Sequence, residues 1–465
     1  NYIAWMLASL VGIALANAIP TEWGLGFAGI LALLGVLCSL ATSRLLDSGG
    51  ELSRLQQLST LSTRLDQLFS EKATGISAPW SSFFDSVNAL SSNAAGSADR
   101  ESVLAQANAL VTRFRQIDQH LDGLDIEVNA GLTAATDEVN RLAKEIAQLN
   151  GRIGGNTSPS GDLLDRRDQL IANLVGYTGG NAVMQDGGIM NVYTAGGQAL
   201  VVGTTASKVT TVSDPYMPER LQLALESAGQ KITLESKTLG GQIGGLLEFR
   251  DTVLTPTQAE LGKLAIGMAS SFNDVHRQGA DLYGNLGGDF FNIGAPRITG
   301  HAGNAGTASM TASFGDLSKL DGQNVVLKFD GTQWQASRAD TGVAIAMTGT
   351  GTATDPLVLN GVELVMTGTP ALNDRMLLQP TAGVAGTMSV AITDTSRIAA
   401  AAPIKGTAAL SNSGTGKLTG VKVTDHGNAA LRNPAAIVFT SGTQYTLDGA
   451  GPFTYTAGQT ISANG

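Results

Sequence analysis

The strongest pattern in the chain is a long run of apolar residues at helical spacing. From residue 110 to residue 149 they recur at intervals of three and four, and two intervals of four meet near Val128. This spacing predicts one amphipathic α-helix with a stutter in its repeat. A run of roughly 50 residues would be about 75 Å long, and its stripe is typical of a bundle seam rather than of a cofactor site. The predicted packing seam contains Leu110, Phe114, Ile117, Leu121, Leu124, Val128, Leu132, Val139, Leu142, Ile146 and Leu149.

Shorter helical patterns flank this run. A leading helix is predicted from Leu46 to Ser70, as the partner of the long helix. Pro79-Trp80 is interpreted as a break, and a further helix follows it. Asp162 is the predicted N-cap of another helix. The leading helix has one apolar stripe, formed by Leu52, Leu55, Leu58, Leu61, Leu65 and Leu68.

The period changes from that of a helix to that of a strand near Ala182. Short strands are predicted around residues 191–193, 200–202, 221–223 and 232–234, separated by Gly-rich turns. An amphipathic helix then begins at Gly244 and continues through Val275. We expect this helix to pack back on the long helix. The helical domain would then be assembled from two separated parts of the chain, with a β insertion between them.

The C-terminal part is expected to consist of strands and turns, with an internal repeat. Val325–Trp334 has the pattern of a β-hairpin, and Ile437–Tyr445 repeats it. The first copy continues through an Asn360-Gly361 turn to a strand at 375–378, and the second copy lacks this half. We therefore expect the chain to stop inside a hairpin, which leaves an unpaired strand edge.

The N-terminus differs from everything that follows. Residues 2–21 and 23–43 carry no charge, and each run has about the ~20 residues that a membrane-spanning helix needs. They predict an apolar helical hairpin, with a buried soluble hairpin as the alternative. The segment Ile19–Ala28 resembles AzlC-type branched-chain amino-acid permeases. Polar sequence begins abruptly after Arg44, so residues 1–43 are interpreted as foreign to the rest, with a true membrane anchor as the competing interpretation.

Composition and charge argue against several functions. The net charge is −10 and no basic run occurs, which excludes nucleic acid as an expected partner. The one cysteine, Cys38, allows no intrachain disulfide. The four histidines are far apart, and no spacing fits a metal site or a catalytic triad. The Asp–Arg cluster of residues 162–170 is interpreted as charge pairs on a helix face. No catalytic residue, cofactor, metal or small-molecule substrate is predicted.

Four blocks carry a specific family resemblance. Residues 83–87, 162–170 and 244–251, and the segment from Phe272 to Phe291, resemble the flagellar hook-associated protein 1 (FlgK) family in order and spacing. The resemblance covers about residues 45–465. Its signature positions are Phe83, Phe84, Asp165, Arg167, Asp168, Arg250, Asp251, Asn273, His276, Arg277, Gly279, Asp281, Leu282, Gly284, Gly288, Phe290 and Phe291.

The resemblance implies an α+β multidomain fold with a discontinuous long-helix bundle and with inserted and C-terminal antiparallel β domains. The expected domains are an apolar hairpin (1–43), a helical rod (44–178), a β-rich segment (179–250), a returning helix (251–280), a β domain with the hairpin repeat (281–400) and a truncated second β repeat (401–465).

The implied function is that of a non-enzymatic subunit that joins hook to filament through subunit contacts. Its implied partners are copies of itself in a ring, the hook protein, a second junction protein and an export chaperone. Family members are secreted without a cleaved signal peptide and carry terminal helices that pair in the flagellar core. Those helices are not recognised here, so normal polymerisation is not expected. The alternative hypothesis is a membrane-anchored surface adhesin or binding module. An enzyme fused to an axial protein would need a paired-carboxylate cleft, which we cannot assign.

Overall fold

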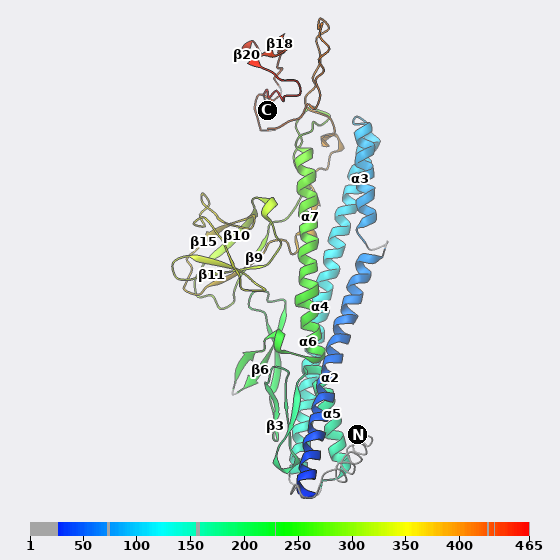
Figure 1. Cartoon of the computed structure of the whole chain (residues 1–465), viewed down its shortest axis with the longest axis vertical. Coiled ribbons are helices and arrows are strands. Elements are labelled where there is room, and N and C mark those ends of the chain that lie inside the picture. Colours follow the sequence, from blue (N-terminus) through cyan, green and yellow to red (C-terminus); the bar gives the residue numbers. More distant parts are fainter. Residues whose placement is uncertain are drawn as a thin grey trace, which may run out of the picture. The chain divides into compact units, whose positions relative to one another are not determined.

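The computed structural model describes residues 27–71, 75–154, 159–227, 229–425, 427–431 and 433–464, with side chains from Arg44 onward. These residues form long helices and six sheets, in which every strand pair is antiparallel (Figure 1). This architecture confirms the predicted fold class of helices with antiparallel β domains.

The described residues form two compact units. The first unit comprises the described parts of Asn1–Gln67, Leu121–Thr257 and His301–Gly303. The second comprises the described parts of Leu68–His120, Gln258–Gly300 and Asn304–Gly465. The domain boundaries expected from the sequence stay a prediction.

The longest helix, α4, runs without a break from Ser97 to Gly154. It therefore extends beyond both ends of the apolar pattern that predicted it. Gly131 interrupts the pattern where a neighbouring helix comes close, because a Cβ on Gly131 would lie 3.1 Å from Leu246 Cδ1. The missing side chain lowers helix propensity by about 1 kcal/mol but lets the two helices approach.

Helix α2 runs from Phe27 to Ser70 as one element, so the structure has no break at the predicted boundary near Ser43. The first arm of the predicted apolar hairpin lies outside the described residues. Among the described residues, none of the helices is long and apolar enough to cross a membrane.

The leucines of α2 do not share one environment, contrary to the single predicted stripe. Leu61 and Leu65 are buried, whereas Leu52 is 56% exposed and Leu55 is 47% exposed. In the exposed part, Gly50 rests against Gly179, whose Cα would lie 3.2 Å from a Cβ on Gly50. The backbone approaches closely there, so this stretch of α2 turns glycine and polar side chains, rather than its leucines, toward the unit.

Two predicted helix boundaries are displaced by two residues or more. Helix α2 ends at Ser70 and α3 spans Ser77–Ser92, so the predicted break between two helices is present but lies before Pro79 and Trp80, which are in the first turn of α3. Proline is tolerated there because the first turn has no intrahelical acceptor for its missing N–H. Helix α5 spans Gly161–Thr178 with Ser160 at the N-cap position, which places Asp162 inside the first turn. An acidic side chain at this place favours the helix through the macrodipole.

The β insertion of the first unit contains two sheets. The four-stranded sheet has the order β1-β2-β3-β4 and the three-stranded sheet the order β5-β6-β7. The strands predicted near residues 192, 201, 222 and 233 are all present. Their bounds are Asn181–Met184 (β1), Met190–Tyr193 (β2), Ala199–Val202 (β3), Thr205–Ala206 (β4), Lys208–Ser213 (β5), Leu221–Ser227 (β6) and Gln230–Thr233 (β7); the short η2 and η3 span Asp186–Gly188 and Ser236–Thr238.

The returning helix is composed of three segments. Helix α6 spans Gly241–Glu248, the π-helical turn η4 spans Phe249–Leu254, and α7 spans Thr255–His276. It therefore begins three residues before the predicted start. Pro256 accounts for the π-helical turn, because proline cannot donate to the carbonyl four residues earlier and a wider turn removes the clash.

The β domain of the second unit is built from two facing sheets. Their orders are β13-β12-β11-β16-β9 and β10-β15-β14. Both sheets contribute to one buried cluster that contains Val325, Leu327, Trp334, Val362 and Leu364. The bounds are Arg297–Gly300 (β9), Ser309–Phe314 (β10), Val325–Phe329 (β11), Trp334–Arg338 (β12), Ala344–Ile345 (β13), Leu357–Leu359 (β14), Val362–Thr367 (β15) and Arg375–Gln379 (β16), with η5 at Leu317–Lys319.

The second hairpin copy is also present as strands. A three-stranded sheet has the order β18-β19-β20 and a two-stranded sheet pairs β17 with β8. The bounds are Phe291–Asn292 (β8), Ser389–Val390 (β17), Ile437–Ser441 (β18), Gln444–Leu447 (β19) and Ala450–Thr454 (β20), with α8 at Val384–Thr387 and η6 at Thr395–Arg397.

Candidate functional site

A buried ion pair connects α4 to the start of strand β6 in the first unit. Arg220 donates from Nε to Asp125 Oδ2 at 2.6 Å and from Nη1 to the Thr255 hydroxyl at 3.1 Å. The Arg220 side chain is 9% exposed and the Asp125 side chain 14%. Both charged groups are buried, so removing one of them would leave the other buried without a partner of opposite charge. The pair therefore ties three separate chain segments together.

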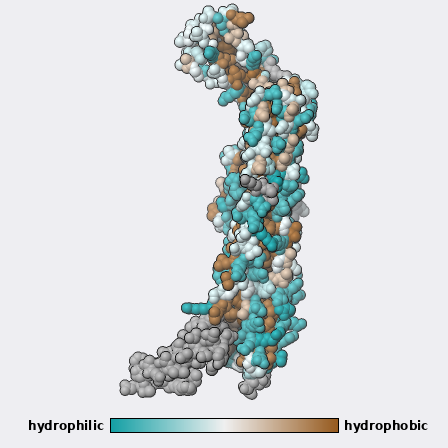
Figure 2. All heavy atoms as spheres, turned by 90° about the vertical axis from the view of Figure 1, so that its right-hand side faces the viewer, coloured by the Kyte–Doolittle hydropathy of each residue, from teal (hydrophilic) through white to brown (hydrophobic). Residues whose placement is uncertain are grey.

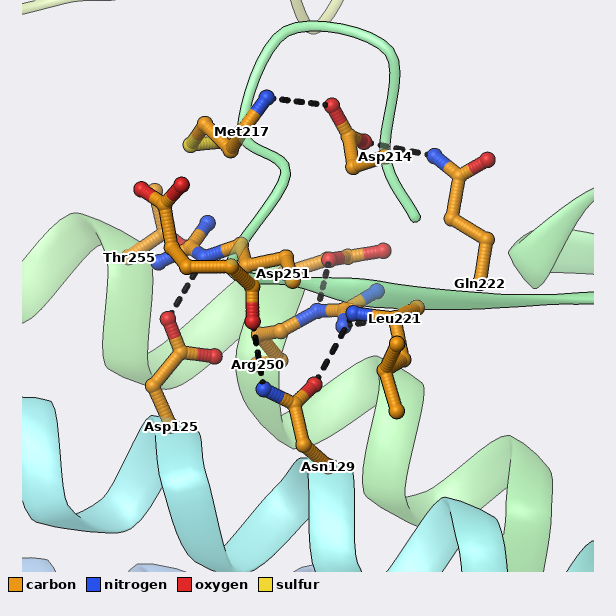
Figure 3. A network of polar contacts seen from close by, with 11 residues as sticks. Asp125, Asn129, Asp214, Met217, Leu221, Gln222, Arg250, Asp251 and Thr255 are labelled. Atoms are coloured by element: carbon orange, nitrogen blue, oxygen red, sulfur yellow. Dashed lines mark hydrogen bonds and ion pairs between the residues drawn. The ribbon is translucent and has the colours of Figure 1, made fainter. Parts of the chain in front are cut away.

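Leu221, the first residue of β6, is the centre of this polar network. Figure 3 shows Asp125 and Asn129 rising from α4, with Asn129 and Arg250 close to Leu221. The Leu221 N–H donates to Asn129 Oδ1 at 2.9 Å, and Arg250 Nη1 donates to the Leu221 carbonyl at 2.7 Å. Helix α4 and the turn η4 thus hold both backbone polar groups of one strand residue.

The loop before β6 is fixed by Asp214. Its Oδ1 accepts from the N–H groups of Tyr216 and Met217 at 2.8 and 3.0 Å, and its Oδ2 accepts from Gln222 Nε2 at 2.6 Å (Figure 3). A short acceptor side chain followed by backbone donors is the chemistry of an Asx turn. These hydrogen bonds of Asp214 therefore fix the conformation of the loop that carries Arg220.

Three asparagines of α4 bind backbone groups of the β insertion, and we call Asn129, Asn140 and Asn150 the asparagine row. Asn129 donates to the Glu219 carbonyl at 2.8 Å and accepts from the Leu221 N–H. Asn140 donates to the Val209 carbonyl and accepts from the Val209 N–H, both at 2.8 Å. Asn150 donates to the Met190 carbonyl at 2.7 Å and accepts from the Met190 N–H at 3.1 Å. The three positions lie about three turns apart, which puts the amides on one face of the helix. The amides of Asn140 and Asn150 each pair with both backbone polar groups of one strand residue, as a neighbouring strand would.

Sequence reasoning missed the asparagine row and the Arg220–Asp125 pair. Asparagine is a poor helix former, so three asparagines at near-regular spacing inside a strong helical pattern were a signal that could have been used. Arg220 gave no signal, because its partner Asp125 is distant in sequence and lies among many polar residues of the same helix.

The residues of the predicted packing seam are nearly all buried. Ten of them are buried and Leu124 is half-buried. The exposed large apolar side chain of this stretch is that of Ile126, which is 69% exposed and lies outside the seam. Burying a leucine or isoleucine side chain contributes about 1.5–3 kcal/mol, so the seam supplies much of the stability of α4.

A second polar cluster surrounds the signature residues of the second unit. Asn273 Oδ1 accepts from the N–H groups of Phe290 and Phe291, both at 2.9 Å, and its Nδ2 donates to the Phe291 carbonyl at 2.9 Å. The four rings of Phe83, Phe272, Phe290 and Phe291 lie 4.8–6.3 Å apart. Phe84 packs on Phe83 at 5.2 Å but is 40% exposed. The signature thus marks a core where α3, α7 and β8 meet.

His276 joins this core to a distant turn. The Ala399 N–H donates to His276 Nε2 at 2.8 Å, and His276 Nδ1 lies 2.8 Å from the Gly288 carbonyl. Because Nε2 accepts, the proton belongs on Nδ1, which makes the ring neutral. His276 is 4% exposed, so it is a structural residue.

The turn after His276 contains the remaining signature residues. Asp281 Oδ1 accepts from the N–H groups of Tyr283 and Asn285 at 2.9 and 2.7 Å. A Cβ on Gly279 would lie 2.5 Å from the Ala399 carbonyl oxygen, so only glycine fits without a shift. Gly284 has a φ of +74°, whereas Leu282 is 50% exposed and Gly288 has open space beside it.

Most of the charged signature residues donate hydrogen bonds to backbone carbonyls or form ion pairs with residues close in sequence. Arg167 is buried and donates to the Gly188 carbonyl at 2.6 Å and to Asp168 at 2.9 Å. Asp165 is exposed. Arg250 and Asp251 are neighbours at 3.4 Å, and Arg277 pairs with Asp274 at 2.9 Å and with Asp289. Within the described residues, no group of three metal-ligating side chains occurs.

Arg100 is a buried cation that sequence reasoning did not single out. It is 1% exposed and donates only to backbone carbonyls, among them Ala94 at 2.6 Å and Ile398 at 2.7 Å. Burial lowers the pKa of its guanidinium from the ordinary value, and Asp281 acts in the opposite direction. Arg100 therefore holds the chain around residue 398 next to the start of α4.

The second unit is expected to lose stability in mild acid through His276. Burial lowers the pKa of the imidazole below its ordinary value of 6.5, although the Gly288 carbonyl and Asp289 act in the opposite direction. Below pH 6.5 the imidazole of His276 therefore binds a proton in the unfolded chain but stays neutral in the folded chain. The contribution of His276 to the free energy of unfolding is complete above that pH and decreases as the pH falls below it. The loss is at most about 1.4 kcal/mol per pH unit.

This pH dependence is measured by urea unfolding between pH 7.5 and 5.5, for the wild type and for His276→Gln. The variant is less stable throughout but has the shallower slope. Parallel slopes for the two proteins would show that His276 does not titrate in this window.

Two family models match the chain. Residues 62–291 match the flagellar hook-associated protein FlgK helical domain, and residues 299–380 match the D2-like domain of flagellar hook-associated protein 1. Flagellar hook-associated protein 1 of Salmonella typhimurium is 36% identical over 367 residues, covering 77% of this chain and 65% of the relative. The corresponding protein of Escherichia coli is 34% identical over 362 residues, covering 76% and 65%.

A solved structure is also similar. The flagellar hook junction protein FlgK from Burkholderia pseudomallei superposes with a TM-score of 0.71 at 31% identity, covering 77% of this chain and 66% of that one. The fold and the matches relate the chain to the hook-associated proteins of the bacterial flagellum. It belongs to the flagellar hook-associated protein 1 family. The chain spans 65% of the length of the first two relatives. The comparisons lend no support to the permease resemblance of residues 1–43.

Proposed function

We propose that the protein is a structural subunit of the junction between flagellar hook and filament, where it acts through contacts with other subunits. The observation that carries this proposal is the match of residues 62–291 to the helical domain of the family, together with 36% identity to a hook-associated protein 1. The extracellular flagellum is the corresponding location.

The described residues support a mechanical role. Helix α4 is one element of 58 residues, and the asparagine row and Arg220 fasten a β insertion to it through buried polar contacts. Such contacts fix the positions of the parts that carry them, because each buried polar group is costly to leave unpaired. A subunit that transmits force needs this fixed internal geometry, whereas it needs no reactive group.

The proposed partners follow from the same family membership. They are copies of the chain in a ring, the hook protein, a second junction protein and an export chaperone. No catalytic role is proposed, because the side chains of the polar clusters described above form hydrogen bonds with backbone groups. The adhesin alternative gains no support from the described helices.

A chimera tests the proposed function. In a Salmonella typhimurium strain without its own hook-associated protein 1, the resident protein is returned with residues 62–380 of this chain in place of the matched region. We expect filaments and swimming to be restored, whereas the strain without the chimera keeps its hooks and releases filament protein into the medium. Electron microscopy and motility assays measure both results.

Two seam controls show whether the fold is needed. Leu142 is fully buried, so Leu142→Asp forces a charge into the seam and the chimera should fail. Gln148→Asp changes the exposed side of the same helix and should preserve filaments. A chimera that is exported and folded but never supports filaments would contradict the proposal.

A further inference from the structure

Residues 395–401, which we call the strap, are bound to the start of α4 and to the end of α7. Arg100 of α4 donates to the Ile398 carbonyl at 2.7 Å. His276, the last residue of α7, accepts at Nε2 from the Ala399 N–H at 2.8 Å. The two side chains therefore bind neighbouring residues of the strap from two different helices.

The rest of the strap is held mainly by backbone hydrogen bonds. The Ser396 carbonyl accepts from the Leu282 N–H at 3.0 Å, and Ala401 exchanges two hydrogen bonds with Ala280 at 2.7 and 3.2 Å. The buried side chain of the strap is that of Ile398, whereas the other side chains of the strap are half-buried or exposed. A segment that buries so little apolar surface opens at a lower free energy than a packed core does.

Arg100 and His276 lie in a different environment from most charged groups of the protein. Figure 2 shows hydrophilic residues spread over the helices on the face that it draws, where water solvates charged groups. Arg100 is only 1% exposed and His276 only 4%. A protonated His276 would place a second buried positive charge at the strap, where like charges repel each other more strongly than in water. The strap's own charged side chain, Arg397, is exposed and also positive.

Protonation would also remove the hydrogen-bond acceptor that holds Ala399. In the neutral ring, Nδ1 carries the proton and lies 2.8 Å from the Gly288 carbonyl oxygen, which leaves the lone pair of Nε2 for the Ala399 N–H. A proton on Nε2 would point at that N–H, so two donors would face each other. The closed strap is therefore compatible with the neutral imidazole only.

Nearby carboxylates oppose this effect only in part. Asp281 favours the charged form of Arg100, and Asp289 favours the charged form of His276. Asp289 is exposed and also pairs with Arg277, so water and a second cation weaken its attraction for a protonated imidazole. Burial acts more strongly on both groups and lowers the pKa of each.

We propose that protonation of His276 in mild acid releases the strap, while the helices and the aromatic core below it stay folded. The core is held by Asn273, which binds the backbone of Phe290 and Phe291 and does not titrate. The inference goes beyond the loss of stability of the whole second unit, because it assigns the proton uptake to a form in which the strap alone has opened. It does not rest on the proposed flagellar function.

Amide hydrogen exchange of the whole chain at pH 7.5 and pH 5.5, followed by mass spectrometry, tests this release. After correction for the intrinsic pH dependence of exchange, the protection of residues 395–401 should fall about tenfold, because a free imidazole one pH unit below its pKa favours the open form by about that factor. Phe290 and Phe291 should keep their protection, since their N–H groups are bound by a side chain that does not titrate.

His276→Gln separates the titration of the ring from its hydrogen bonds. A glutamine amide can accept from the Ala399 N–H and donate to the Gly288 carbonyl, as the neutral ring does, but it takes up no proton in this range. Protection of the strap in this variant should not differ between the two pH values. His120→Gln is the matched control, because His120 is an exposed histidine of α4, and this variant should keep the tenfold response.

Three results would overturn the proposal. The first is equal protection of the strap at pH 7.5 and pH 5.5 in the wild type. The second is a tenfold loss that persists in His276→Gln, which would assign the titration to another group. The third is a loss of protection at Phe290 and Phe291 as large as that in the strap, because the opening would then include the core.

Discussion

Arg220→Leu is expected to lower the free energy of unfolding of the first unit by about 3–5 kcal/mol, because the substitution leaves Asp125 charged and buried without its partner. The Arg220 side chain is only 9% exposed, so solvent screens the pair little. Asp125 Oδ1 already has no hydrogen-bond partner among the described residues, so the carboxylate has little other stabilisation. Urea unfolding followed by circular dichroism measures the change.

The double variant Arg220→Leu with Asp125→Leu separates a lost ion pair from a lost packing interaction. Removing both charges should recover most of the loss, because neither group is then buried without compensation. Arg166→Leu is a suitable control, since its side chain is 65% exposed and lies 3.7 Å from Glu145. Equal losses in the single and the double variant would show that the charge of Asp125 is not the cause.

Two glycines of α7 are expected to respond in opposite directions to the same substitution. Gly262→Ala should destabilise the second unit by about 3 kcal/mol, because a Cβ there would lie 1.8 Å from the carbonyl oxygen of the fully buried Thr381. Gly267→Ala should stabilise it by about 0.5–1 kcal/mol, because its Cβ meets no atom within 4 Å and alanine favours the helix.

Thermal and denaturant unfolding of both variants test this contrast. Helix propensity changes in the same way at the two positions, so the difference between them reports the contact with Thr381 alone. If both variants were more stable than the wild type, α7 and the segment around Thr381 would not be in contact in solution.

The sequence by itself determined the elements whose signals are local. The three-and-four spacing of residues 110–149 predicted a long helix because an apolar stripe needs that period. The turn at Asn360-Gly361 predicted a hairpin because both residues tolerate a positive φ, and the structure has φ values of 45° and 79° there. The four signature blocks were sufficient to identify the family.

The tertiary structure decided everything that depends on distant parts of the chain. The asparagine row and the Arg220–Asp125 pair look like ordinary surface residues in the sequence, because their strand partners are 40 to 95 residues away. The sequence also did not predict that Leu52 and Leu55 are exposed. The spacing of apolar residues predicts which residues share one face of a helix, but it does not predict which part of that face packs against the core. Burial and pairing are properties of the packed neighbours, so the folded chain alone fixes them.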